Sequence, residues 1–155
     1  MQSFLYEDYV RTEWVDYNKH MNDAAYATAF SLAGEQLLED IGLNEEGRNR
    51  HHYTIFTLES HIVYLKEAHE HERLLADVQW IDTDEKRLHL FYTLYNEEKE
   101  RIAVCEQMLM GMSQETNRPA PFPEDIQQAI TAKARQDQDK PVPKEVGRTI
   151  GIKKK

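Results

Sequence analysis

The chain has 155 residues, 40% of them hydrophobic, which is enough for one domain with its own core. Its formal net charge of −9 argues against a nucleic-acid-binding protein, which would carry a basic stripe. Cys105 is the only cysteine, so no intramolecular disulfide can form, and no stretch approaches the roughly 20 apolar residues of a membrane span. We therefore expect a cytoplasmic protein that binds neither nucleic acid nor a membrane.

A short strand and a long helix, joined by a polar loop, are the first predicted elements. The strand covers residues 6–15, and the loop covers residues 16–22. Asn22 or Asp23 can cap the helix that follows. Apolar residues then recur at helical spacing until Gly42, a typical C-terminal stop: Tyr26, Phe30, Ala33, Leu37 and Ile41. Alanines fill the first half of this helix, so its backbone can lie close to a sheet.

Four strands are predicted after a polar link at residues 44–50. Alternate residues are apolar in three of them, at 54–65, 74–81 and 88–95, whereas 102–112 is apolar on both faces. The charged links between the last three strands are short, which predicts antiparallel hairpins. One helix on one antiparallel sheet is an α+β layer architecture. Its uncovered face and edge strands favour a homodimer, or a tetramer built from it.

The C-terminal part of the chain follows a different pattern. Three prolines in the segment RPAPFP end the strand pattern, and a short helix is predicted over 124–134. Residues 140–155 are predicted to form an extended tail that wraps the domain or is disordered. We accordingly place the main domain at 1–115, and 116–155 as an extension packed on that domain or trailing from it.

The stretch richest in chemistry lies directly before the long helix. Asp16, Asn18 and His20 place a carboxylate, an amide and an imidazole two residues apart from one another. The carboxylate or the imidazole can activate a water molecule. The first N–H groups of a helix have no intrahelical partner, so the backbone at Asp23 and Ala24 is a candidate oxyanion site.

The order of strand, helix and four strands matches the hotdog fold, in which a curved sheet wraps one central helix. The loop resembles that of hotdog acyl thioesterases: in the 4-hydroxybenzoyl-CoA type, an aspartate sits ten residues before a helical tyrosine, as Asp16 does before Tyr26. It is also similar to the D-x-N-x-H-x-N-N of plant acyl-ACP thioesterases, with Asp23 at the second asparagine. Their Y-R-R-E-C segment corresponds here to YLKEA, which retains the glutamate as Glu67 and has Ala68 for the cysteine.

The C-terminal extension carries a further resemblance. PFPEDIQQAI and the ending P-V-P-x-x-x-G-R-T-I are similar to the thioesterase found alone or fused to L-carnitine dehydrogenase, a group associated with betainyl-CoA hydrolysis. The resemblance covers residues 8–150. It implies a homodimeric thioesterase that cleaves a short-chain acyl-CoA to free acid and CoA without a cofactor.

The resemblance also implies roles for the polar residues, each with a structural alternative. Asp16 would attack the thioester carbonyl or activate a water, or it could simply hold a turn. Asn18 would orient the water or the carbonyl, or make an Asx turn. His20 would act as general base or orient Asp16, or face solvent. Glu67, which the partner subunit could supply, would share the base role or remain a solvated charge.

Four residues near the loop are candidates for substrate binding. Trp14 and Tyr17 could face the quaternary ammonium of a betaine-like acyl group, because aromatic rings bind cations; the alternative is a place in the core. Asn22 is a candidate for a substrate contact or for the helix cap. Tyr26 is the helical tyrosine of the motif.

No metal is expected. His69 and His71 flank Glu70 and would share one face of a strand, but a zinc site needs three or four ligands and no partner spacing stands out. Cys105 lies in an apolar strand and is interpreted as an inert core residue.

Two other functions fit the same fold. An acyl-CoA hydratase or dehydratase would resemble D-x-x-x-x-H, and the interval from Asp16 to His20 is one residue shorter. A non-catalytic acyl- or protein-binding module would have Asp16 and Glu67 pointing away from any shared cleft.

Overall fold

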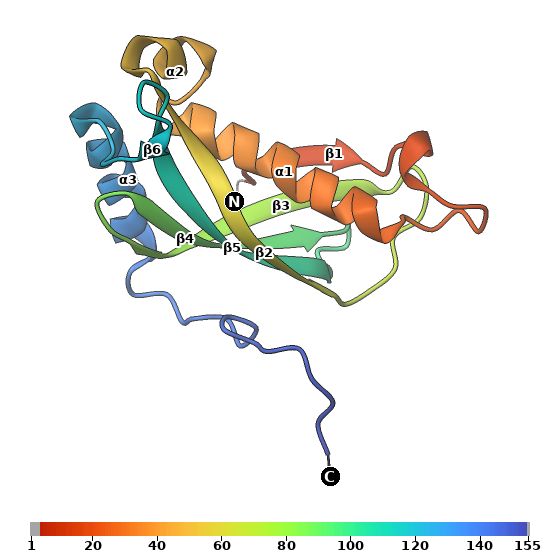
Figure 1. Ribbon diagram of the computed structural model, residues 1–155. Coiled ribbons are helices and arrows are strands. Elements are labelled where there is room, and N and C mark those ends of the chain that lie inside the picture. The colour runs from red at the N-terminus through yellow and green to blue at the C-terminus, as the bar shows by residue number, and fades with distance from the viewer. Residues whose placement is uncertain (1–3, 155) are drawn as a thin grey trace.

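The computed structural model describes residues 4–154, in which one antiparallel sheet curves around helix α1 (Asp23–Asp40) (Figure 1). The strands lie in the order β1-β3-β4-β5-β2, and β6 pairs with β5. Their bounds are Tyr6–Tyr9 for β1, Tyr53–Tyr64 for β2, Arg73–Thr83 for β3, Arg87–Tyr95 for β4, Arg101–Ser113 for β5 and Arg118–Pro119 for β6. This arrangement confirms the predicted α+β hotdog fold.

The central helix packs on the sheet through its small residues. Ala25, Ala29 and Ala33 repeat at four-residue spacing, and all three are buried. Phe30 fills the space beside them at 1% exposure. The helix begins where predicted, because the Asn22 side chain caps it by accepting a hydrogen bond from the backbone N–H of Ala25 at 2.9 Å.

Two predicted segments differ in the structure. The first strand ends at Tyr9, and a 3₁₀ turn, η1 (Thr12–Trp14), follows it. The link predicted at 44–50 is largely a helix, α2 (Glu45–His51), which the Asn44 side chain caps by accepting from the N–H of Gly47 at 2.9 Å. An Asn cap, an acidic first turn and a basic last turn are the sequence signals for this helix, and its lack of an apolar stripe explains why periodicity missed it.

Strand β2 forms one edge of the sheet. Its alternating pattern predicted a buried face, yet Phe56 and Leu58 are 52% and 51% exposed, and a register shift interrupts the pairing with β5 between Thr57 and Glu59. An apolar, unpaired edge of this length is a surface that proteins normally cover.

The C-terminal extension is built onto the sheet. Helix α3 (Glu124–Asp137) packs against β3, and its last residue, Asp137, accepts a hydrogen bond from the Trp80 backbone N–H at 2.8 Å. Further along, the Glu145 carboxylate binds the Arg101 guanidinium through both oxygens, before the chain runs away from the sheet (Figure 1). The division at residue 115 stays a prediction, because these contacts do not show whether 1–115 folds alone.

None of the helices within residues 4–154 is long and apolar enough to cross a membrane. The Cys105 thiol is fully buried, and burial raises its pKa to about 12, which keeps it protonated and unreactive as expected.

Candidate active site

The loop before α1 is closed on itself by backbone hydrogen bonds. Val15 and Met21 form an antiparallel bridge, and the N–H of Asp16 donates to the carbonyl of His20 at 3.0 Å. Lys19 takes a positive φ of 66° at the tip. These bonds fix the backbone that carries Asp16, Asn18 and His20 at the start of α1.

Asp16 uses one carboxylate oxygen to hold this loop. Its Oδ1 accepts from the backbone N–H of Asn18 at 2.8 Å and of His20 at 3.3 Å. Its Oδ2 has no hydrogen-bond partner among residues 4–154, and the side chain is exposed. The turn-forming role predicted for Asp16 is thus filled by Oδ1, while Oδ2 can still contact a water or a substrate.

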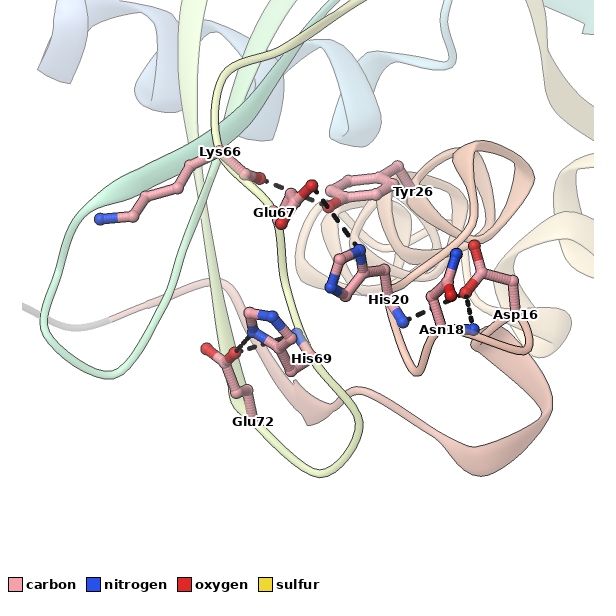
Figure 2. Close-up of polar contacts among 8 residues, drawn as sticks. All are labelled: Asp16, Asn18, His20, Tyr26, Lys66, Glu67, His69 and Glu72. Carbon is pink, nitrogen blue, oxygen red and sulfur yellow. Dashed lines mark hydrogen bonds and ion pairs between the residues drawn. The ribbon is translucent and has the colours of Figure 1, made fainter.

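His20 points away from Asp16 and toward Glu67 (Figure 2). Its Nδ1 lies 3.6 Å from Oε1 of Glu67, which follows β2 in the link to β3. The structure brings these residues together within one chain because Met21 N–H donates to the carbonyl of Ala68 at 2.8 Å. The polar side chains of the loop therefore do not form one cluster: Asp16 contacts backbone N–H groups, whereas the His20 imidazole pairs with Glu67.

The N-terminus of α1 provides unpaired donors between these groups. Both polar atoms of the Asn22 amide have partners within the chain. Its Oδ1 caps the helix by accepting from the N–H of Ala25, and its Nδ2 donates to the carbonyl of Trp14 at 2.8 Å. A substrate contact by Asn22 stays a prediction. The backbone N–H groups of Asp23 and Ala24 contact no acceptor in the described part of the chain, and both residues are exposed. This is the arrangement that an oxyanion site requires.

The two aromatic residues predicted beside the loop are placed differently from one another. Trp14 is 6% exposed, and the guanidinium of Arg11 lies 4.6 Å from the centre of its ring. Tyr17 is 93% exposed on the loop. The core alternative thus holds for Trp14, and contact of either ring with an acyl group stays a prediction.

Tyr26 and Tyr64 form the aromatic corner of this site. Their rings meet edge to face with centroids 5.1 Å apart, and Tyr64 donates from its hydroxyl to the carbonyl of Asp23 at 3.3 Å. Burial, with the nearby charge of Glu67, raises the pKa of the Tyr26 phenol, so it stays neutral and can donate. Tyr64 was not among the predicted site residues, although it is the tyrosine of the YLKEA segment that contains Glu67.

A groove of about 350 Å³ runs between α1 and the strands β2 and β5. Ala27, Ser31 and Glu35 line it from the helix, and Thr57 and Gln107 line it from the sheet. Three of its lining residues, Ile55, Thr57 and Ser60, belong to β2, the edge strand with exposed apolar residues.

One group of side chains on this face could hold a metal ion. His20, Glu67 and His69 place ligand atoms within 4.8 Å of one another. His71, which would share a face with His69 in a strand, instead lies in a turn with a positive φ of 70° and is not part of the group. Sequence spacing could not show this group, because it joins two segments far apart in the chain.

The curved sheet around one helix, with unpaired N–H groups and a carboxylate loop at the helix start, defines a hotdog-fold protein of the acyl-thioester-binding type. Residues 10–130 match the family model described as the thioesterase-like superfamily, and the chain belongs to that family. The resemblance inferred from the loop and the extension is confirmed.

Two relatives and one solved structure are similar to this chain over most of its length. The betainyl-CoA thioesterase of Pseudomonas aeruginosa is 39% identical over 148 residues, which are 95% of this chain and 93% of that protein. The L-carnitine dehydrogenase/betainyl-CoA thioesterase of Agrobacterium fabrum is 33% identical over 146 residues, 94% of this chain but 30% of that longer protein. A Staphylococcus aureus protein solved in complex with CoA is 34% identical, with a TM-score of 0.91 over 96% of this chain and 94% of that one.

Proposed function

We propose that this chain is an acyl-CoA thioesterase that hydrolyses betainyl-CoA or a closely similar short acyl-CoA to the free acid and CoA. The observation that carries the proposal is the unpaired N–H pair at Asp23 and Ala24 with Asp16 on the loop beside it. The 39% identity to a betainyl-CoA thioesterase supports the acyl group, and the relative solved with CoA supports CoA as the carrier.

The proposed chemistry follows from the positions of these groups. The thioester carbonyl accepts hydrogen bonds from the N–H groups of Asp23 and Ala24, which stabilise the negative charge of the tetrahedral intermediate. The free oxygen of Asp16 removes a proton from the attacking water, or attacks the carbonyl itself to form a mixed anhydride that water then hydrolyses to the free acid. Collapse of the intermediate breaks the C–S bond, and the thiolate takes up a proton to leave as CoA. That proton is the one that Asp16 took from the water, returned directly or through solvent, and His20 and Glu67 lie beside the site as further proton carriers.

Thiol release from a panel of acyl-CoAs tests the activity. We expect betainyl-CoA to be cleaved with the highest kcat/KM of a set that also contains acetyl-, butanoyl- and benzoyl-CoA. A chain that cleaves none of them above background would contradict the proposal. Loss of enoyl-CoA absorbance without thiol release would favour the hydratase instead.

The aromatic corner gives a prediction about the acyl group. We propose that the ring of Tyr64, which is 50% exposed and packs edge to face on the buried Tyr26, receives the trimethylammonium group, since aromatic faces attract quaternary ammonium ions by about 0.5–2 kcal/mol. Tyr64→Leu should therefore lower kcat/KM for betainyl-CoA by roughly tenfold. The neutral isostere 3,3-dimethylbutanoyl-CoA should lose less than twofold, as measured by thiol release.

Tyr64→Phe is the matched control, because it keeps the ring and removes only the hydroxyl that contacts Asp23. It should retain the preference for the charged substrate. An equal loss of both substrates in Tyr64→Leu would show that Tyr64 acts only on the structure of the site.

We also propose that two copies pair along β2. This strand is an edge of the sheet, it exposes Phe56 and Leu58, and it lines the groove beside α1. A second copy placed there would bury the apolar edge and complete the groove wall.

Leu58→Asp should convert the dimer into a monomer, because the buried edge would then hold an unpaired charge. Light scattering after size-exclusion chromatography gives the mass directly. Val142→Asp is the control, since Val142 is 62% exposed on the C-terminal extension and should leave the dimer intact. A wild-type chain that elutes as a monomer would contradict the pairing.

A further inference from the structure

His69 and Glu72 have no part in the proposed hydrolysis, yet they extend the group formed by His20 and Glu67. We propose that His20, Glu67 and His69 form a binding site for a divalent transition-metal ion of the zinc class, with Glu72 orienting His69. The inference goes beyond the proposed function, because it depends on His69 and Glu72, which the proposed hydrolysis does not use, in addition to His20 and Glu67, which it does use.

The three ligand groups converge from two segments of the chain. Their ligand atoms all lie within 4.8 Å of one another, and the rings of His20 and His69 meet nearly at right angles with centroids 4.8 Å apart. Two imidazoles in this relation can direct nitrogens at one point without stacking on each other. Figure 2 shows both rings and the Glu67 carboxylate on the same side of the loop.

The backbone holds these two segments in register. His20 and His69 form an antiparallel bridge, Met21 N–H donates to the Ala68 carbonyl at 2.8 Å, and Glu70 N–H donates to the Lys19 carbonyl at 3.2 Å. The two histidines are therefore fixed by main-chain bonds on both sides. The backbone thus brings the two histidines together before an ion binds, and the exposed side chains would close from this 4.8 Å spread to the shorter spacing that a zinc ion requires.

Glu72 supplies the outer contact that metal-binding histidines usually have. Its Oε1 lies 2.7 Å from Nδ1 of His69 and also accepts from the His69 backbone N–H at 2.9 Å (Figure 2). A proton on Nδ1 that is donated to a carboxylate leaves Nε2 as the free ligand nitrogen.

The chemistry of the donors selects the kind of ion. Two imidazoles and one carboxylate suit zinc and the neighbouring transition metals, whereas magnesium and calcium prefer oxygen ligands alone. Three protein ligands leave one tetrahedral position of a zinc ion open to water. The side chains of Glu67 and His69 are 70% and 54% exposed, so an ion can enter directly from solvent.

The site is tested by zinc titration of the full chain after chelator treatment and dialysis. Isothermal titration calorimetry in excess magnesium should show one zinc ion per chain. His69→Asn should weaken zinc binding at least tenfold, and Glu72→Gln should weaken it by roughly 10–100-fold, since it alters only the outer contact. Cobalt substitution should give the visible absorption of a four-coordinate site, lost in His69→Asn.

His71→Asn is the matched control. It removes a neighbouring exposed histidine that lies outside the group, at a positive φ that asparagine tolerates. This variant should bind zinc like the wild type, and circular dichroism should show that all three variants fold. Equal zinc affinity in His69→Asn and wild type, or equal weakening in His71→Asn, would overturn the proposal.

Discussion

Asp16→Asn should lower kcat for thioester hydrolysis by about 10²–10⁴-fold while leaving the loop intact. The amide oxygen of asparagine can still accept from the backbone N–H groups of Asn18 and His20, as Oδ1 of Asp16 does now. Only the negative charge and the free Oδ2 are lost. Thiol release and circular dichroism measure the two effects separately.

Asp16→Ala removes both roles, so the pair of variants separates chemistry from structure. If Asp16 only held the turn, Asp16→Asn would keep the wild-type rate and Asp16→Ala alone would lose it. Glu13→Gln, which neutralises another exposed carboxylate near the loop, should leave the rate unchanged.

Gly111→Ala should lower the free energy of unfolding by at least about 2 kcal/mol, the scale of an overpacked core. A methyl group there would lie 1.7 Å from the hydroxyl oxygen of Tyr53 and 3.1 Å from Cε1 of Phe122. Tyr53 would have to move, and its hydrogen bond to the Ala120 carbonyl at 2.7 Å would break. Thermal unfolding should show the melting temperature fall by roughly 4–8 °C.

Gly151→Ala is the matched control, because a methyl group there meets nothing within 4 Å. Adding Tyr53→Phe to Gly111→Ala should recover part of the loss, since it removes the atom in closest contact. A Gly111→Ala chain as stable as Gly151→Ala would show that β5 and Tyr53 separate at little cost.

Local patterns predicted the elements that define the fold. The spacing from Tyr26 to Ile41 gave the helix, and the alternation in 74–81 and 88–95 gave β3 and β4, because each signal depends only on residues near in sequence. The α2 helix was missed, since its polar residues carry caps and charge without an apolar stripe.

Only part of the candidate site could be predicted from the sequence. Asp16, Asn18 and His20 lie together in the chain, so their loop could be identified directly, and Glu67 followed from the family resemblance. The side chain of His20 lies toward Glu67 and away from Asp16 because main-chain contacts join the loop to the link after β2. No short-range sequence pattern encodes these contacts. Tyr64 and His69 enter the site for the same reason.

The donors proposed to hold the oxyanion belong to the main chain at Asp23 and Ala24, not to side chains. Natural relatives could therefore carry many different residues at these two positions and keep the same catalytic power. Among the common amino acids only proline lacks the N–H, and proline is well accommodated in the first turn of a helix. Evolution could thus remove one oxyanion donor at these positions without disturbing the fold, a route by which a thioesterase of this kind could turn into an acyl-CoA-binding protein.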